Sequence, residues 1–535
     1  MGGTMSSLLG GFADSVQNVP HRTALHLNGQ RWTYQQLSGQ SGRIAGAIAE
    51  GGLSQHRLVG LMASESLTAY AGVLAILAAG RGFVPIDPAY PPRQIEAIVD
   101  HAGIDTLVVG VEDLDRLDNL LHSVRRPLAI IAPEADGQLR GLTARHRRHR
   151  YQTASDMPAR CWPVVSTTAP QSTAYLSYTS GSTGVRRGVP VSHANVCAYL
   201  DAVDERFSVT PEDRCSHTFP LTFDLSIHDM FTTWSNGAAL VAWSSSRQMT
   251  PAQFIRRHRL TRWFSVPTMA MAMKRRGELG DNNLGSLRRT LFCGEPLPAS
   301  VATAWSQAAP DSSIINLYGP TEATIAVTSH RFRPGDVEQY RRGVVSLGEP
   351  FDDQTVCVVD DGGRPVGPGG RGELWISGPQ VTDGYWSSPE ETSRHFVERA
   401  VDGPARTWFR TGDCVERDEQ GRLHFVGRLD EQIKLGGHHV ELPEVDRVLR
   451  QACGHELACA VGWPRDDTGV YGLVGLVATD EPIDDCRLLA DCRRKLPHSM
   501  VPDRLIGIDE LPTNHRGKLD RQAMQQLLEH REVLT

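Results

Sequence analysis

A run of glycine, serine and threonine at residues 178–184 is the first feature of this sequence that could bind a ligand. It follows residues 173–177, which are predicted to form a buried strand. Glycine lets a backbone turn sharply and approach a ligand, and the hydroxyls add donors, so such a loop can hold phosphate oxygens. The GxxxxGK[ST] spacing of a Walker A loop is absent. On residue types alone, a flexible polar turn is an equal alternative.

Lysine is scarce in this chain, because four of the 55 basic residues are lysines and the others are arginine. This skew indicates the base composition of the source genome, and it draws attention to each lysine. Lys518 stands between Gly517 and Leu519 near the end of the chain. Taken alone, it would be interpreted as a surface residue. An ammonium is nevertheless a compact charge that can contact two anionic oxygens at once, which the planar guanidinium does less readily.

Nine short motifs follow one another along the chain. They occur at residues 32–37, 74–90, 179–193, 223–226, 316–322, 372–386, 410–413, 427–434 and 514–521, and they include TSGSTG, FDLS, NLYGPTE, RTGD and GRLDEQIK. In content and order they resemble the motifs of the adenylate-forming (ANL) superfamily, which comprises acyl-CoA synthetases, luciferases and the adenylation domains of nonribosomal peptide synthetases. The resemblance covers residues 20–525, essentially the whole chain.

The resemblance implies a two-step reaction. A carboxylate and ATP give an acyl-AMP and pyrophosphate, and the acyl group then passes to a thiol. Because the substrate carboxylate must approach a negatively charged α-phosphate, catalysis depends on positioning and charge neutralisation. A general base is not needed, since a carboxylate is deprotonated at neutral pH. The implied cofactors are ATP and Mg²⁺.

The nucleotide site implied by the resemblance draws on several motifs. The phosphate loop closes over the β- and γ-phosphates, and Tyr318 stacks on adenine. Asp413 accepts from the ribose hydroxyls, and Arg428 contacts the ribose or the phosphates. The implied ATP- or AMP-binding residues are Thr179, Ser180, Gly181, Ser182, Thr183, Gly184, Gly294, Glu295, Pro296, Asn316, Tyr318, Gly319, Asp413 and Arg428.

Three residues carry the chemistry under this resemblance. Lys518 matches the lysine that bridges the substrate carboxylate and the α-phosphate, and Thr321 lies near that phosphate. Glu322 is the implied Mg²⁺ ligand, because Mg²⁺ prefers one or two carboxylates together with phosphate oxygens. Asp430 matches a hinge between two poses of a small C-terminal domain.

Asp224, in the FDLS motif, indicates the class of substrate. In amino-acid-activating members of the superfamily this aspartate pairs with the α-ammonium group. A fatty-acid or aryl-acid enzyme has no use for a buried carboxylate there, since an unpaired buried charge is costly. The structural alternative is an aspartate that caps the following helix.

The other pocket positions are mainly apolar, which argues against a charged substrate side chain. By motif register they are Leu225, His228, Phe264, Leu291, Cys293, Leu317, Ile325 and Ala326, with Lys518 closing the set. The pattern is most similar to that of free-standing enzymes that activate L-proline. Cysteine or a small aliphatic amino acid are the alternatives, and His228 could donate one hydrogen bond. Pockets of this kind discriminate weakly between near-isosteres.

The chain departs from the superfamily pattern at two places. Arg186 and Arg187 stand where a proline and a lysine usually follow the phosphate loop, so the charge is kept but its shape is changed. Residues 436–439, Gly-Gly-His-His, replace a stretch that often contains an arginine, which leaves the detail of the thiol-transfer surface open. Lys434, just before this stretch, is expected to have a structural role.

The elements that must position these residues alternate between strand and helix. Residues 24–27, 59–62, 82–86 and 373–377 are predicted strands, and residues 34–49 and 67–80 are predicted helices. Such alternation favours an α/β architecture. With the resemblance it implies a large N-terminal domain of layered sheets and helices, residues 1–429, and a small mobile α+β domain, residues 430–535. Residues 137–150 are rich in arginine and histidine without apolar periodicity, and are interpreted as a solvated loop rather than a partner-binding patch.

Composition excludes other classes of protein. A net charge of −7 argues against a nucleic-acid partner. Residues 67–80 form the longest apolar stretch, too short to cross a membrane. The N-terminus lacks the pattern of a signal peptide. Ten cysteines without a CxxC pair favour free thiols and a cytoplasmic location.

The expected protein is therefore an amino acid:[carrier protein] ligase. No phosphopantetheine attachment motif follows Arg521, so a free-standing enzyme that loads a separate phosphopantetheinylated carrier protein is expected, in secondary-metabolite biosynthesis. The alternatives are an acyl- or aryl-CoA ligase and a non-catalytic nucleotide-binding protein. The sequence leaves open the carrier, the product, the oligomeric state, and whether a small activator protein is needed, as for some relatives.

Overall fold

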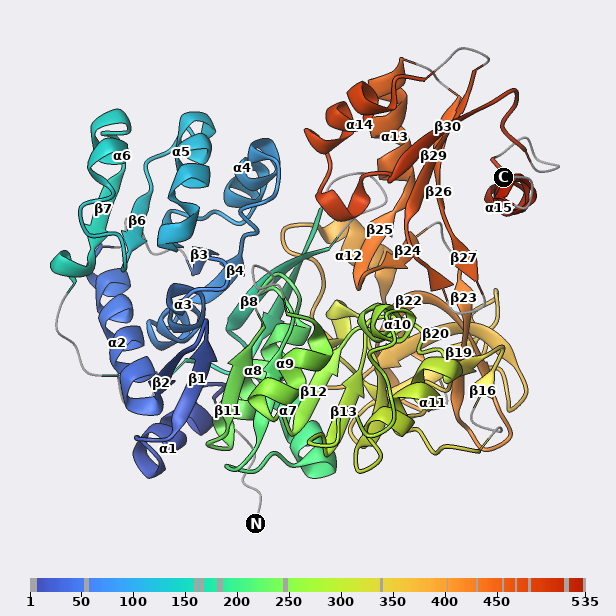
Figure 1. Cartoon of the computed structure of the whole chain (residues 1–535), viewed down its shortest axis with the longest axis horizontal. Coiled ribbons are helices and arrows are strands. Elements are labelled where there is room, and N and C mark those ends of the chain that lie inside the picture. Colours follow the sequence, from blue (N-terminus) through green and yellow to red (C-terminus); the bar gives the residue numbers. More distant parts are fainter. Residues whose placement is uncertain are drawn as a thin grey trace.

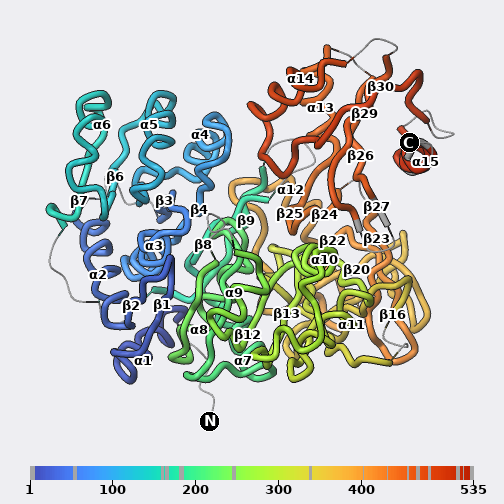
Figure 2. The backbone as a smooth tube through the Cα atoms, viewed as in Figure 1, coloured from blue at the N-terminus to red at the C-terminus, as the bar shows by residue number. Residues whose placement is uncertain are grey.

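The computed structural model describes residues 7–51, 57–157, 162, 168–179, 186–243, 249–336, 340–401, 403–429, 432–454, 457–466, 469–479, 483–513 and 519–532. Three large sheets with their helices make up the bulk of the molecule, and a smaller unit follows from residue 432 (Figure 1). The first and last described residues lie far apart (Figure 2).

The first sheet has seven strands, parallel except for the last pair. Its order is β7 (Arg150–Thr153), β6 (Ala129–Ala132), β5 (Thr106–Val109), β3 (Leu58–Met62), β4 (Gly82–Pro85), β8 (Thr173–Thr179) and β9 (Arg187–Ser192). Parallel strands are joined by crossover helices that cover the sheet, so their residues are apolar on both faces. The associated helices are α2 (Tyr34–Gly51), α3 (Leu67–Ala78), α4 (Pro92–His101), α5 (Leu114–Ser123), α6 (Arg140–Arg145) and α7 (His193–Phe207).

The second sheet has nine strands with a parallel centre and antiparallel edges. Its order is β18 (Glu349–Pro350), β15 (Thr328–Arg331), β14 (Ser313–Tyr318), β13 (Arg289–Phe292), β12 (Arg262–Ser265), β10 (Arg214–His217), β11 (Ala239–Ala242), β1 (Thr23–Leu27) and β2 (Gln30–Thr33). Its helices are α1 (Gly10–Asn18), α8 (Leu225–Ser235), α9 (Pro251–His258), α10 (Pro267–Arg275) and α11 (Ala299–Ala308).

The third sheet is antiparallel. It contains β19 (Thr355–Val359), β20 (Arg371–Ser377), β21 (Phe396–Ala400), β22 (Ala405–Arg417) and β23 (Leu423–Arg428). Helix α12 (Pro389–His395) lies between β20 and β21 in the chain, and the hairpin of β16 (Tyr340–Arg341) and β17 (Val344–Val345) comes before β19. The smaller unit contains β24 (Gln432–Leu435), β25 (His438–Glu441), α13 (Leu442–Cys453), β26 (Ala458–Gly462), β27 (Arg465–Asp466), β28 (Gly469–Val470), β29 (Leu473–Ala478), α14 (Asp485–Arg493), β30 (Arg504–Ile508) and α15 (Arg521–Glu532).

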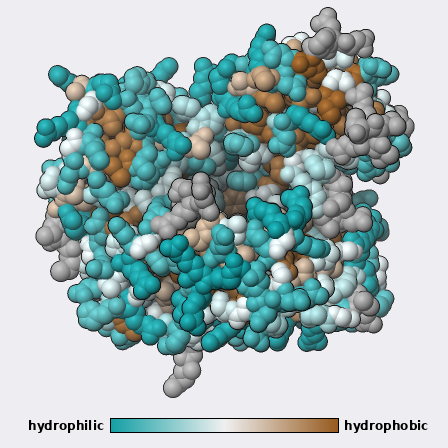
Figure 3. Space-filling view, viewed as in Figure 1, coloured by the Kyte–Doolittle hydropathy of each residue, from teal (hydrophilic) through white to brown (hydrophobic). Residues whose placement is uncertain are grey.

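The predicted elements in the first hundred residues are confirmed within two residues at each end. Helix α3 is buried from Thr68 to Ala78, which explains its apolar character on all sides. Within the described part of the chain, no helix has both the length and the apolarity needed to cross a membrane. The face in Figure 3 is largely hydrophilic, with apolar side chains in separate patches.

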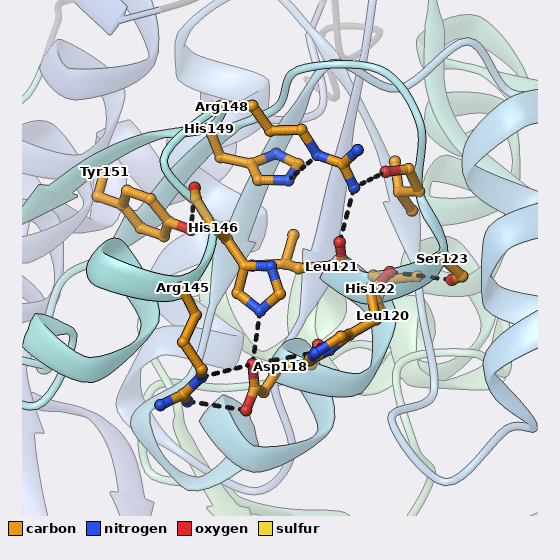
Figure 4. Close-up of polar contacts among 11 residues, drawn as sticks. Asp118, Leu120, Leu121, His122, Ser123, Arg145, His146, Arg148, His149 and Tyr151 are labelled. Atoms are coloured by element: carbon orange, nitrogen blue, oxygen red, sulfur yellow. Dashed lines mark hydrogen bonds and ion pairs between the residues drawn. The ribbon is translucent and has the colours of Figure 1, made fainter.

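The prediction of a solvated loop at residues 137–150 is wrong in part, because residues 140–145 form a helix, although the arginines of the segment are exposed. The segment contains α6, anchored by buried Leu139 and Leu142, and three of its basic residues, Arg145, His146 and Arg148, contact α5. Arg148 donates to the carbonyl of Leu121 at 2.8 Å, as Figure 4 shows, and also to the carbonyl of Val124. An arginine at the last carbonyls of a helix satisfies acceptors that have no partner within the helix. The charged residues of this segment are therefore partly structural, which periodicity alone does not reveal.

Candidate active site

Asp224 lies immediately before α8, at the edge of the nine-stranded sheet. It occupies the N-cap position but makes no side-chain cap hydrogen bond, so the helix-cap alternative does not describe it. Its Oδ2 atom is buried and has no hydrogen-bond partner among the described residues. Burial raises the pKa of this carboxyl to about 6, and hydrogen bonding from Thr321 partly offsets that rise. A carboxylate in this condition is suited to receive a cation.

A cavity of about 80 Å³ lies beside Asp224. Its apolar wall includes Leu225, Cys293 and Ile325, three of the positions predicted to contact the substrate side chain. Leu317 and Ala326 belong to the same buried cluster without lining the cavity. The cavity therefore combines one carboxylate with an apolar wall on one side and polar or basic side chains, among them Arg186 and Lys434, elsewhere.

His228, Phe264 and Leu291 line a second, smaller space of about 20 Å³. The ring of His228 meets the edge of Phe264 at 4.7 Å between centroids, and its Nδ1 lies 2.8 Å from the hydroxyl of Tyr199. Burial lowers the pKa of His228 to about 3, so the imidazole is neutral. These three predicted pocket residues form the layer behind the cavity wall.

A further cavity of about 250 Å³ lies on the other side of Thr321. Thr179, Thr321 and His439 line both this cavity and the one at Asp224. Glu322 also lines it and accepts a hydrogen bond of 2.8 Å from the Tyr385 hydroxyl. The wall carries many cationic or imidazole groups, namely Arg187, Arg394, His395, Arg410, Arg428 and His439. Such a wall is suited to a polyanion.

The two arginines that follow the phosphate loop have separate contacts. Arg187 forms an ion pair of 2.8 Å with Glu391, and its guanidinium lies 5.5 Å from the centre of the Tyr385 ring. Arg186 lies 4.7 Å from the centre of the Tyr90 ring and lines the cavity at Asp224. Arg187 is thus the residue placed beside Glu322, while Arg186 contributes to the other cavity.

Asp413 is buried and fully engaged at its two oxygens. The Tyr318 hydroxyl donates to Oδ2 at 2.6 Å, and Arg428 donates to Oδ1 at 2.8 Å. The three residues predicted for the nucleotide site are therefore in mutual contact. Asn316 lies deeper, where its amide donates to the Ser346 carbonyl at 2.9 Å, and it lines neither cavity.

The smaller unit closes one side of the cavity at Asp224. The backbone N–H of Gly437 donates to Glu295 at 2.8 Å, the His438 ring lies 4.5 Å from that of Phe223, and the Lys434 ammonium lies 5.6 Å from the Tyr318 ring centre. Residues 434–439, which we call the docking loop, include four that line the cavity: Lys434, Gly437, His438 and His439.

Comparison with known proteins settles the family. The model of the AMP-binding enzyme family matches residues 12–386. The chain belongs to this family. Among relatives of this AMP-binding enzyme, an L-proline–[L-prolyl-carrier protein] ligase of Pseudomonas fluorescens is 30% identical, with 96% of this chain and 98% of that protein covered.

Solved structures agree with the family. The Vibrio cholerae adenylation domain AlmE, in complex with glycyl-adenosine-5'-phosphate, has a TM-score of 0.89 at 30% identity, with 99% of each chain covered. Tyrocidine synthase 2 of Brevibacillus parabrevis is 28% identical over 96% of this chain, which spans 13% of that protein's length. The predicted α/β fold and the predicted membership of the adenylate-forming superfamily are confirmed.

Some predicted site residues of this AMP-binding enzyme lie outside the described residues. They are Ser180, Gly181, Ser182, Thr183, Gly184, Asp430 and Lys518. Their roles stay predictions, as does the domain boundary at 429–430. Of the others, Gly294 and Gly319 line the cavity at Asp224, Glu295 holds the docking loop, and Pro296 follows directly.

Sequence reasoning missed several residues of the site. Tyr90 and Arg186 fall inside recognised motifs, so a signal existed but their role in the cavity was not inferred. Lys434 was expected to be structural, whereas it lines the cavity at Asp224. His438 and His439 carry no signal of their own, because their position depends on how the smaller unit docks.

Proposed function

We propose that this enzyme activates an amino acid with ATP as an aminoacyl-AMP and transfers the aminoacyl group to the phosphopantetheine thiol of a carrier protein. The observation that carries the proposal is the carboxylate of Asp224, which is buried at the cavity and whose Oδ2 atom has no hydrogen-bond partner among the described residues. A buried carboxylate without a cation beside it is costly, and the ammonium of an amino acid supplies that cation.

An acyl- or aryl-CoA ligase is the alternative within the family. A fatty or aryl acid would leave the buried carboxylate of Asp224 without a cationic partner. A non-catalytic nucleotide-binding protein is the alternative of another class. The convergence of Asp224, Thr321 and Glu322 on two joined cavities supports an enzyme.

We favour L-proline as the amino acid. Its compact ring suits a small cavity with Leu225, Cys293 and Ile325 on its wall, and one relative at 30% identity is named as a proline ligase. Glycine, cysteine and small aliphatic amino acids are the competitors, since the AlmE relative holds a glycyl adenylate at the same identity.

The cavity beside Glu322 is where we place the phosphates of ATP. Its cationic wall complements a triphosphate, and Thr321 stands between this cavity and the carboxylate end of the amino acid cavity. The Glu322 carboxylate is an oxygen donor of the type that Mg²⁺ prefers, and the Tyr385 hydroxyl orients it. When bound there, Mg²⁺ neutralises phosphate charge. Tyr318 and Asp413 form the adenosine end.

We propose that the observed pose of the smaller unit is the thiol-transfer pose. The docking loop lines the cavity at Asp224, whereas Thr513 and Leu519, which flank the segment of Lys518, line neither cavity. In Figure 1, α15 lies at the outer edge of the smaller unit. A second pose would then bring Lys518 to the α-phosphate for adenylation. The proposed partner is a separate carrier protein. Co-expression with a small activator protein tests whether the enzyme needs one.

Amino-acid-dependent exchange of labelled pyrophosphate into ATP tests the function. The panel consists of the twenty amino acids together with benzoate, a medium-chain fatty acid and buffer alone. We expect exchange with L-proline or another small amino acid and none with the other acids. Exchange with the non-amino acids alone would establish the CoA-ligase alternative, and no exchange at all would support a non-catalytic protein.

The activity should depend on pH through Asp224. Only the ionised carboxylate can pair with an ammonium, so kcat/KM for the amino acid should fall tenfold per pH unit below a pKa of about 6. Measurement at saturating ATP between pH 5 and 8 checks this. An Asp224→Asn enzyme should not show this fall in kcat/KM at low pH. A wild-type profile that stays flat to pH 5 would show that Asp224 does not hold the amine.

Lys518→Ala should lower the rate of adenylation by roughly 10²- to 10³-fold, because it removes the cation that stabilises charge in the transition state. ATP binding should remain measurable by equilibrium dialysis. Lys495, an exposed lysine that donates to Gln451, supplies the matched control Lys495→Ala, which should keep full activity. A Lys518→Ala enzyme with undiminished exchange would refute the role.

A further inference from the structure

Asp118, His122 and His146 bring three metal-ligating side chains together, well apart in sequence from the active-site motifs. Asp118 and His122 lie four residues apart on one face of α5, and His146 follows α6 (Figure 4). One ligand atom from each lies within 4.8 Å of the other two. The two imidazole rings meet edge to face at 4.6 Å between centroids. The spacing in sequence gives little sign of this group, because His146 comes from another element.

The contacts within the cluster divide the Asp118 carboxylate into two ends. Oδ1 faces the imidazoles, 2.6 Å from Nε2 of His146 and 3.9 Å from Nδ1 of His122. The Arg145 guanidinium donates to Oδ2 at 2.8 Å and, more weakly, to Oδ1 at 3.4 Å. Arg145 therefore holds Asp118 mainly through Oδ2, and a metal ion at Oδ1 would replace the short contact with His146 and the long one with Arg145.

We propose that Asp118, His122 and His146 bind a Zn²⁺ ion that joins α5 to the segment after α6. Two imidazoles and one carboxylate are ligands that Zn²⁺ accepts, with a fourth position for water. Mg²⁺ and Ca²⁺ prefer oxygen ligands and do not fit this set. Tetrahedral Zn²⁺ ligands lie about 3.3 Å apart, so the His146–Asp118 pair must open by less than 1 Å and the exposed His122 ring must turn inward.

The surroundings of the two histidines support this geometry. Nδ1 of His122 lies 2.7 Å from the backbone carbonyl of Asp118, which leaves Nε2 without a proton when Nδ1 donates. His146 is 7% exposed, so its ring has few alternative orientations. Arg145 is the opposing influence, because its positive charge next to Asp118 lowers the affinity for a cation. We therefore expect binding in the micromolar range.

Zinc titration of the whole enzyme by isothermal calorimetry tests the proposal. His122→Gln is the primary variant, because an exposed side chain can be replaced without disturbing the core, and we expect a loss of affinity of at least tenfold. His146→Gln should have a similar effect. Arg145→Gln should bind Zn²⁺ more tightly, which a purely structural role of the cluster would not produce. Zn²⁺ should also raise the melting temperature of the wild type but not of His122→Gln.

His530→Gln is the matched control. His530 is also an exposed helical histidine whose Nδ1 lies 2.7 Å from the carbonyl four residues earlier, in Gln526. It should bind Zn²⁺ as the wild type does. Anomalous scattering at the zinc edge should place the ion at His122 and His146. Equal binding by wild type and His122→Gln, anomalous density confined to other histidines or cysteines, or no binding at millimolar Zn²⁺ would each overturn the proposal.

Discussion

Asp224→Ala is expected to lower kcat/KM for the amino acid by roughly 30- to 4,000-fold, since truncating one partner of a buried charge pair costs about 2–5 kcal/mol. The Asp224 carboxylate is the group that we place against the substrate ammonium, and three apolar side chains of the same cavity offer no substitute. Steady-state pyrophosphate exchange measures the loss. Unchanged amino acid turnover would show that the amine is held elsewhere.

Asp224 supports activity but should lower the stability of the folded enzyme at neutral pH. Its folded pKa of about 6 lies above the value of about 3.8 in an unfolded chain. The unfolded state then ionises first, so the free energy of unfolding falls as pH rises from about 4 to 6, by about 3 kcal/mol in total. Asp224→Asn should therefore raise the melting temperature of the enzyme at pH 8 and leave it unchanged at pH 4. An equal change at both pH values would indicate a packing effect instead.

Gly437→Val is expected to lower transfer to the carrier thiol by on the order of 10²-fold, with much less effect on adenylation. The backbone at Gly437 has φ +81°, which side chains rarely adopt. An added Cβ would lie 2.8 Å from Cγ1 of Val266 and 2.9 Å from Cε1 of Phe223, so the docking loop would be pushed out. Separate assays of pyrophosphate exchange and of carrier loading measure the two steps.

The neighbouring glycine provides the control for this variant. Gly436 has φ +57° and nothing within 4 Å of an added Cβ. Gly436→Ala tests the strain of a left-handed backbone without a clash, and Gly437→Ala adds the clash to the same strain. Carrier loading should fall more in Gly437→Ala. Equal effects would mean that backbone strain, and not contact with Phe223, determines the outcome.

Much of the candidate site could be predicted because its residues lie close to strand ends. Cys293 follows β13 and Gly319 follows β14. These two strands are adjacent and parallel, so their carboxyl ends meet at one edge of the sheet. Ligands of open α/β sheets bind at such edges. Motifs that follow successive strands in the sequence therefore lie next to one another at this edge of the sheet. Asp224, which precedes α8, reaches the same edge.

The features that could not be predicted depend on contacts between distant segments. The docking loop reaches Glu295 and Phe223 only through the orientation of the smaller unit, which no local pattern encodes. The helix at Arg140–Arg145 is short, and two leucines are too few to establish a period. The basic residues after it contact α5, a contact that charge composition alone cannot distinguish from solvation.

The few contacts of the docking loop have a consequence for the balance between poses. Among the described residues, the backbone hydrogen bond to Glu295, the ring-edge contact with Phe223 and the cation–π contact with Tyr318 each contribute about 1 kcal/mol, and Tyr471 of the smaller unit adds a cation–π contact with Arg275. Docking also costs the freedom of the smaller unit. The net difference is then a few kcal/mol, within the range that differential binding of ATP, adenylate or carrier can reverse. Each substrate can in this way select the pose in which it reacts.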